Sequence, residues 1–91
     1  MKDRLDLYRK AIESWGIEAQ VFMVMEEVGE MLNALAKANR GRSTSKEIIT
    51  ELADVSIMME QMASYFGWEE FEKEKEYKLE RLKERLEYDK V

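Results

Sequence analysis

Apolar residues recur at helical spacing in four stretches of this chain, separated by three short breaks. The breaks lie at Gly16, at the polar segment Arg40–Ser45 and at Gly67. The expected helices run from about Lys2 to Trp15, from about Glu18 to Asn39, from the capping pair Thr44 and Glu47 to Gly67, and from about Trp68 to Tyr88. We therefore predict a single all-α domain over residues 1–91, resembling a four-helix bundle.

The second and third predicted helices are apolar on more than one side. The stripe expected in the second helix comprises Val21, Val24, Val28, Leu32 and Leu35, and that in the third comprises Ile48, Leu52, Val55, Met59, Met62 and Phe66. Ile57 and Met58 extend the apolar surface of the third helix beyond its stripe. A helix that is apolar on several sides needs neighbours on several sides. We therefore expect a homo-oligomer, either a dimer or a tetramer.

The amino-acid composition excludes several kinds of site. The chain contains no Cys and no His, so it has no disulfide, thiolate nucleophile, Ser-His-Asp triad or histidine-bearing zinc site. Any metal would be held by oxygen, which favours Mg²⁺ or, as a substitute, Mn²⁺. The net charge of −5 argues against binding to duplex nucleic acid.

The sequence gives no sign of a membrane protein. No apolar run approaches the roughly 20 residues that a membrane span needs, and the charged N-terminal stretch lacks the apolar core of a signal peptide. We expect a cytoplasmic protein, in the host cytoplasm if a phage encodes it.

Two acidic pairs stand in apolar stretches that lack any basic residue. Glu27 and Glu30 lie in the Lys- and Arg-free stretch from 11 to 36, and Glu51 and Asp54 lie in a second such stretch from 47 to 72. Each pair has the i, i+3 spacing that places both carboxylates on one side of a helix. Acids in such surroundings must become protonated, pair with a cation from another segment, or hold a metal ion.

Other acidic pairs at the same spacing, such as Glu84 and Glu87, lie among Lys and Arg residues and are expected to be solvated. If the two apolar helices pack antiparallel, the first two pairs can converge on one groove. A divalent ion held there by carboxylates would keep open positions for phosphate oxygens, which is the arrangement used in phosphoryl transfer. Interhelical salt bridges are the alternative.

The acidic motifs resemble those of a known family. The segment Glu27-Val28-Gly29-Glu30, twenty intervening residues and then Glu51-Leu52-Ala53-Asp54 are similar to the ExxE…ExxD signature of the MazG-like nucleotide pyrophosphohydrolases, which are all-α enzymes. The stretches WGIEAQVFMVMEEVGEML and KEIITELADVSIMMEQM resemble the two motif helices, and YKLERLKERL resembles the C-terminal helix of short, often phage-encoded members.

This resemblance implies the Mg²⁺-dependent hydrolysis of a nucleoside triphosphate to a monophosphate and pyrophosphate. By motif position, Glu27, Glu30, Glu51 and Asp54 would be the metal ligands. Glu27 or Glu30 would also act in catalysis by orienting or deprotonating the attacking water, a role that the adjacent Glu26 could share. Glu26 could equally be a surface acid that faces a lysine of the last helix.

Phosphate groups need cations, and the preferred candidates are Lys78 and Arg81 because they lie in the segment that resembles the C-terminal helix of the family. Lys37, Arg40 and Arg42 are further candidates, and pairing with glutamates is the alternative for all of them. Trp15, Gln20 and Asn33 could line a base pocket, although Trp15 could also be a core residue. A carboxylate-bridged di-iron bundle fits poorly without His. A non-catalytic helical module for nucleotide binding or oligomerisation stays open.

Overall fold

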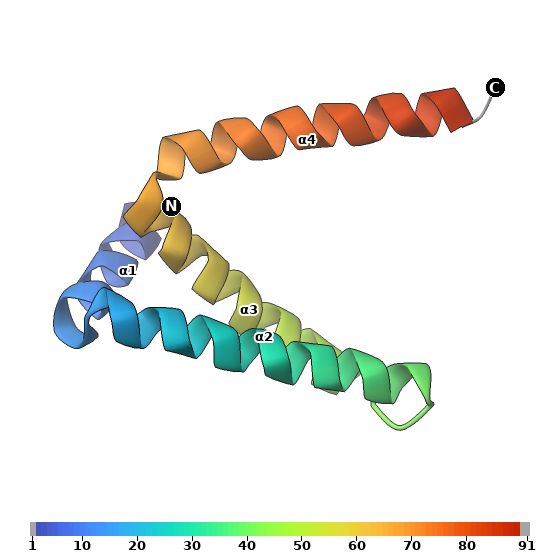
Figure 1. Cartoon of the computed structure of the whole chain (residues 1–91), viewed down its shortest axis with the longest axis horizontal. Coiled ribbons are helices and arrows are strands. Elements are labelled where there is room, and N and C mark those ends of the chain that lie inside the picture. Colours follow the sequence, from blue (N-terminus) through green and yellow to red (C-terminus); the bar gives the residue numbers. More distant parts are fainter. Residues whose placement is uncertain (1, 90–91) are drawn as a thin grey trace.

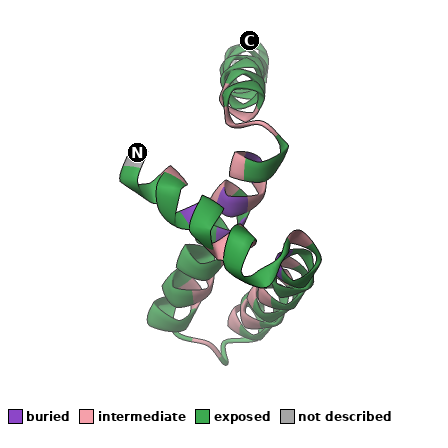
Figure 2. Cartoon of the chain, turned by 90° about the vertical axis from the view of Figure 1, so that its left-hand side faces the viewer, coloured by how far each residue is buried: buried purple, intermediate pink, exposed green. Residues whose placement is uncertain are grey.

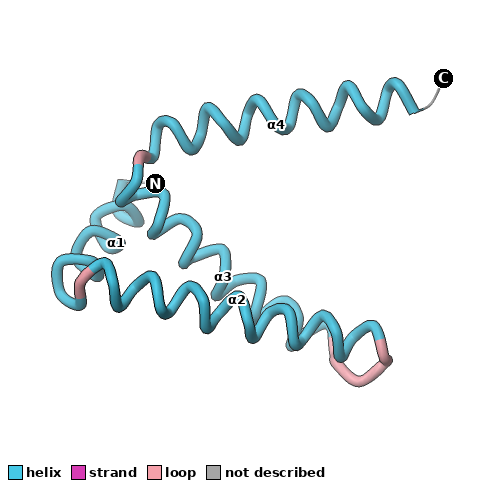
Figure 3. The backbone as a smooth tube through the Cα atoms, viewed as in Figure 1, coloured by secondary structure: helices cyan, strands magenta, loops and turns pink. Residues whose placement is uncertain are grey.

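The computed structural model describes residues 2–89, and this part of the chain folds into helices joined by short turns (Figure 3). The helices are α1 (Lys2–Trp15), α2 (Ile17–Asn39), α3 (Ser45–Phe66) and α4 (Trp68–Asp89). No strand occurs within this range. The prediction of an all-α protein is therefore confirmed, and the helix boundaries agree with the sequence to within one or two residues.

Local chemistry sets these boundaries. Gly16 and Gly67 separate consecutive helices with φ angles of 87° and 145°, a region that residues with a Cβ atom rarely adopt. At the start of α3 the backbone N–H of Glu47 donates to Oγ1 of Thr44 at 3.2 Å, and its carboxylate accepts from the N–H of Thr44. The predicted capping box is thus present, and it satisfies donors that a helix N-terminus leaves free.

The two motif helices form an antiparallel hairpin (Figure 1). Its register is marked by a buried hydrogen bond in which the side-chain amide of Gln61 donates to the side-chain oxygen of Gln20. Helix α1 crosses this hairpin and is held by Tyr8, whose hydroxyl donates to Glu60, and by an ion pair of 3.3 Å between Arg4 and Glu60. Burial together with the Glu60 hydrogen bond raises the pKa of Tyr8 to about 12. Tyr8 is therefore a neutral donor at physiological pH.

The side of each motif helix that faces the other differs from the predicted stripes. Residues 24, 27, 28, 31 and 34 of α2 and residues 48, 51, 55, 58 and 62 of α3 are buried or half-buried. The other stripe residues, Val21, Leu32 and Leu35 of α2 and Leu52, Met59 and Phe66 of α3, are exposed. The predicted stripes are therefore right in part: one edge of each stripe lies in the interface, at Val24, Val28, Ile48, Val55 and Met62. The other edge is exposed, because the interface is turned toward Glu27 and Glu51.

These six exposed apolar residues form what we call the uncovered face. Val21 and Phe66 line the same surface pocket, so the exposed stripes of the two helices lie on one side of the hairpin. Helix α1 packs against a different side of α3, where Ala53, Ile57 and Glu60 line one pocket together with residues of α1. No described segment covers the uncovered face, and Leu52 and Phe66 are 47% and 74% exposed.

The hydrophobic core of the single chain is small. Among the described residues only Tyr8, Met58 and Ala63 are buried hydrophobic residues. Figure 2 shows that most of each helix is exposed and that buried positions are few. The expectation that Trp15 could be a core tryptophan is wrong, because 66% of this residue is exposed. Trp15 is the last residue of α1, where the chain turns at Gly16. No helix in the described range combines the length and hydrophobicity that a membrane span requires.

Helix α4 stands apart from the other three. It contacts only α3 and extends away from the hairpin (Figure 1). The radius of gyration is 16.2 Å, whereas a compact domain of this length would have one of about 12 Å. The single chain is therefore a three-helix unit with one projecting helix, and its shape leaves much apolar surface without a partner.

Candidate metal centre

The hairpin brings acids from both motifs together. Counting seven residues along each helix from the Gln20–Gln61 hydrogen bond reaches Glu27 on α2 and Asp54 on α3. At 1.5 Å per residue the acids lie about 10.5 Å along the hairpin from the amides. Glu27, Glu51 and Asp54 each place one carboxylate oxygen within 4.8 Å of the others. These three residues are called the acid cluster below.

Two oxygens of the acid cluster have no partner. Glu27 and Glu51 are half-buried between α2 and α3, and Asp54 is exposed at the edge of the interface. The Oε2 atoms of Glu27 and Glu51 are buried, and neither makes a hydrogen bond within the described part of the chain. Buried polar atoms almost always have a partner, because leaving one unsatisfied costs free energy. These two atoms therefore mark a place where a cation or a proton is needed.

No basic side chain meets this need within residues 3–89. The ion pairs in that range are Arg4–Glu60, Arg9–Asp6, Lys75–Glu72 and Lys78–Glu74, and none of them includes an acid of the two motifs. The alternative of salt bridges between the motif helices is therefore not realised among the described side chains. The remaining alternatives are protonation of the acids and a bound metal ion.

The surroundings of Glu27 raise its pKa, which agrees with protonation of this acid and with a bound metal ion alike. Burial is the largest cause that raises its pKa, followed by the negative charges of Glu30, Asp54, Glu51 and Glu26 in that order. A carboxyl group with these neighbours holds its proton to higher pH than a solvated glutamate. A divalent cation would replace the proton and offset the mutual repulsion. Three carboxylates from two helices match the oxygen ligands that Mg²⁺ and Mn²⁺ prefer.

The other acids predicted for the site lie at its edge. Glu30 is exposed one turn after Glu27 and does not belong to the acid cluster. Its charge is nevertheless the second cause of the raised pKa of Glu27, so the two carboxylates are near each other. Glu26 is exposed and makes the smallest contribution of these neighbours.

The basic residues predicted to bind phosphate are not brought to the acid cluster within one chain. Lys78 pairs with Glu74 at 3.6 Å, and the guanidinium of Arg81 lies 5.9 Å from the centre of the Tyr77 ring. Both lie on α4, which makes no contact with α2. Lys37 is exposed near the end of α2, ten residues or about 15 Å along the helix from Glu27.

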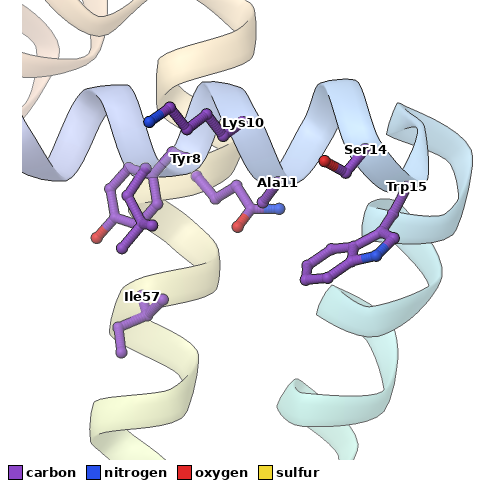
Figure 4. A pocket seen from close by; sticks show the side chains of 8 residues that line it. Tyr8, Lys10, Ala11, Ser14, Trp15 and Ile57 are labelled. Carbon is purple, nitrogen blue, oxygen red and sulfur yellow. The ribbon is translucent and has the colours of Figure 1, made fainter.

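The residues predicted for a base pocket occupy different environments. Gln20 is buried in its hydrogen bond with Gln61, whereas Asn33 is exposed. Trp15 lines an open pocket between α1 and α3 together with Tyr8, Ile57 and Gln61 (Figure 4). Sequence reasoning did not select Tyr8 or Gln61 for this pocket. The only available signal was an isolated amide, Gln61, in the apolar stretch of the third helix.

No protein-family model, curated protein sequence or solved structure matches this chain. The resemblance to the MazG-like family therefore stays a prediction that rests on the two acidic motifs.

Proposed function

We propose that this protein is a MazG-like, Mg²⁺-dependent nucleoside triphosphate pyrophosphohydrolase that releases a monophosphate and pyrophosphate. The observation that carries the proposal is the pair of buried carboxylate oxygens, on Glu27 and Glu51, that have no partner in a cluster without basic neighbours. Glu27, Glu51 and Asp54 would hold the ion, with Glu30 completing the set from the edge. Mn²⁺ would substitute for Mg²⁺ because it shares the preference for oxygen ligands.

The chain's own residues have separate tasks in this reaction. A bound Mg²⁺ would supply charge neutralisation for the phosphates and a lower pKa for water. The half-buried Glu51 provides a ligand oxygen fixed by packing between the helices. Glu30 is exposed beside the acid cluster, where its carboxylate can orient the attacking water and accept a proton. Glu27 would contribute a ligand oxygen from α2, opposite Glu51 and Asp54 of α3, and could help to orient the attacking water.

The proposal includes self-association through the uncovered face. A second copy is always available to cover six exposed apolar residues that the chain itself leaves in water, and a symmetric dimer would pair this face with itself. In an oligomer, α4 of one copy could approach the acid cluster of another, which would bring Lys78 and Arg81 to the phosphates. We place this reaction in the cytoplasm.

Substitutions at the acid cluster test the proposal. Glu51→Gln and Asp54→Asn each remove one ligand charge, and we expect each to lower Mg²⁺-dependent turnover at least 100-fold, since even residues that only support metal ligands cost about 10- to 100-fold when changed. Glu84→Gln is the matched control because Glu84 is an exposed acid of α4. Full activity in either cluster variant, measured as pyrophosphate release, would disprove the metal-site assignment.

A second candidate function is a non-catalytic module for nucleotide binding or oligomerisation. The extent of exposed apolar surface on α2 and α3 favours it. Pyrophosphate release by the wild-type chain separates the two functions, because a module of this kind would assemble normally and release no pyrophosphate with either metal.

A further inference from the structure

We infer that Gln20 and Gln61 are positioning residues, which hold α2 and α3 in the register that gathers the acid cluster. The side-chain amide of Gln61 donates a hydrogen bond to the side-chain oxygen of Gln20, and the two residues are called the amide pair below. This inference rests on the proposed metal site and adds to it two residues that do not touch the ion. It does not depend on the reaction that takes place there.

The amide pair lies in the interior of the hairpin. Gln20 and Gln61 are 3% and 4% exposed, and they are the only buried polar residues in the part of the chain that the structure describes. Replacing both partners of a buried hydrogen bond by apolar groups of the same shape can be neutral or even stabilising. Stability alone therefore does not explain the amide pair. A buried polar contact between helices can instead specify their register, at some cost in stability.

The amide pair lies on the same side of each helix as the acids. Gln20 and Glu27 are seven residues apart on α2, and Asp54 and Gln61 are seven residues apart on α3. Seven residues are close to two full helical turns, so each amide shares one side of its helix with an acid. A single hydrogen bond thus fixes the height at which Glu27 meets Asp54 and Glu51.

The apolar contacts between α2 and α3 specify this register only weakly. Val24 and Met31 of α2 and Met58 and Met62 of α3 recur at helical spacing. A shift of one turn, about 5.4 Å, would therefore bring apolar side chains together again, and methionine adapts readily to such changes. The connecting residues 40–44 can span about 17 Å when extended, and packed helices lie only about 8–10 Å apart. The connection therefore permits a shift of one turn.

Repulsion between the acids favours such a shift in the metal-free chain. The carboxylates of Glu27, Glu51 and Asp54 lie close together, and no ion pair among the described side chains includes any of them. Moving one helix by a turn would separate these like charges. The same movement would break the hydrogen bond of two buried amides, which is costly. The amide pair therefore keeps the acids together before an ion arrives, and such preorganisation lowers the cost of binding.

Methionine substitutions separate positioning from stability. In Gln20→Met or Gln61→Met one buried amide loses its partner, so we expect each variant to have a lower free energy of unfolding in EDTA. The double variant loses both amides and should be at least as stable as the wild type. Its apparent affinity for Mn²⁺, measured by electron paramagnetic resonance of the free ion, should nevertheless fall about tenfold if one chain in ten keeps the binding register. A purely structural role would change stability and affinity in the same direction.

Thr44→Ala is the matched control. Thr44 caps α3 seven residues before Glu51, and its side-chain hydrogen bond stays within α3. Loss of the cap should lower the free energy of unfolding and leave the affinity for Mn²⁺ unchanged. The inference would be overturned if the double variant bound Mn²⁺ as the wild type does. It would equally be overturned if the double variant were less stable than either single variant.

A structural measurement in EDTA keeps the test independent of metal binding. Nuclear Overhauser effects between the methyl groups of Val24 and Val28 of α2 and those of Val55 and Met58 of α3 should report one arrangement in the wild type. The double variant should show additional or different contacts. This result, with a wild type that binds no Mn²⁺, would refute the proposed metal site and support the positioning role. Unchanged contacts in the double variant would refute the positioning role, whether or not the wild type binds Mn²⁺.

Discussion

Glu27 and Glu51 occupy interface positions at which the neighbouring turns of α2 and α3 carry Val24, Met31, Val55 and Met58. An acid in such a position is costly because burial disfavours its charged form and the other acids repel it. An apolar residue of similar size would pack between the helices without this cost. We interpret the two glutamates as residues that serve the site at the expense of the stability of the metal-free chain.

The pH dependence of stability tests this interpretation at Glu27. Its pKa is raised above the ordinary value of 4.5, so the folded chain holds this proton to higher pH than the unfolded chain does. The free energy of unfolding contributed by Glu27 therefore falls as pH rises from about 4.5 through its folded pKa. In Glu27→Gln the free energy of unfolding should lose this dependence on pH. The variant should also be more stable than the wild type at pH 7 without metal.

Denaturant unfolding in EDTA, measured at several pH values, checks this prediction, with Glu84→Gln as the control for the loss of one charge. Identical pH slopes in Glu27→Gln and the wild type would contradict it. Addition of Mg²⁺ at a hundred times its Kd should raise the free energy of unfolding of the wild type by about 2.7 kcal/mol, and this gain should be smaller in Glu27→Gln.

At the scale of the helices, sequence predicted the boundaries well and the facing sides poorly. Gly16, Gly67 and the Thr44–Glu47 capping box act within a few residues, so their effect can be read locally. The side of α2 that meets α3 depends on which of several apolar sides finds a partner, and periodicity cannot choose between them. Leu32 and Leu52 are therefore exposed on the uncovered face, although they belong to the same predicted stripes as the half-buried Val28 and Val55.

The uncovered face yields a prediction about assembly. Leu52→Glu places a charge on this face, and burying that charge against a second copy would be costly. We expect the dissociation constant of the oligomer to increase at least about tenfold, which corresponds to about 1.4 kcal/mol. Sedimentation velocity over a range of protein concentrations measures this. Tyr88→Glu, which changes an exposed residue at the end of α4, should assemble normally. If Leu52→Glu assembles as the wild type does, the uncovered face is not the interface between copies.

At the scale of the whole molecule, the single chain has little packing to stabilise it. Three hydrophobic residues are buried in the part that the structure describes, and α4 projects from the rest (Figure 1). The spacing of the motifs was enough to predict that acids from both could meet, because an antiparallel hairpin places the two motifs at the same height along its axis. The open pocket that Tyr8, Trp15 and Gln61 line could not be predicted in this way. It exists because α1 crosses α3 at Tyr8 and Glu60, and this crossing depends on contacts between residues far apart in the sequence.

The small core also predicts that stability depends on protein concentration. If folding is coupled to association, dilution favours the unfolded chain and lowers the melting temperature. We expect the melting temperature to rise steadily across a hundredfold increase in concentration, as measured by circular dichroism in cells of different path length. In Leu52→Glu the melting temperature should be lower and should change less with protein concentration. A melting temperature that is independent of concentration in the wild type would indicate a stable monomer.

The most direct test of the central claim is the analysis of products from a panel of ribo- and deoxyribonucleoside triphosphates, incubated with Mg²⁺, with Mn²⁺ or with EDTA. The acid cluster predicts equal amounts of monophosphate and pyrophosphate in the presence of either metal, and none in EDTA. Orthophosphate in place of pyrophosphate would mean that a different bond is cut. A folded protein that releases neither product from any member of the panel would contradict the claim that Glu27, Glu51 and Asp54 form the catalytic metal site.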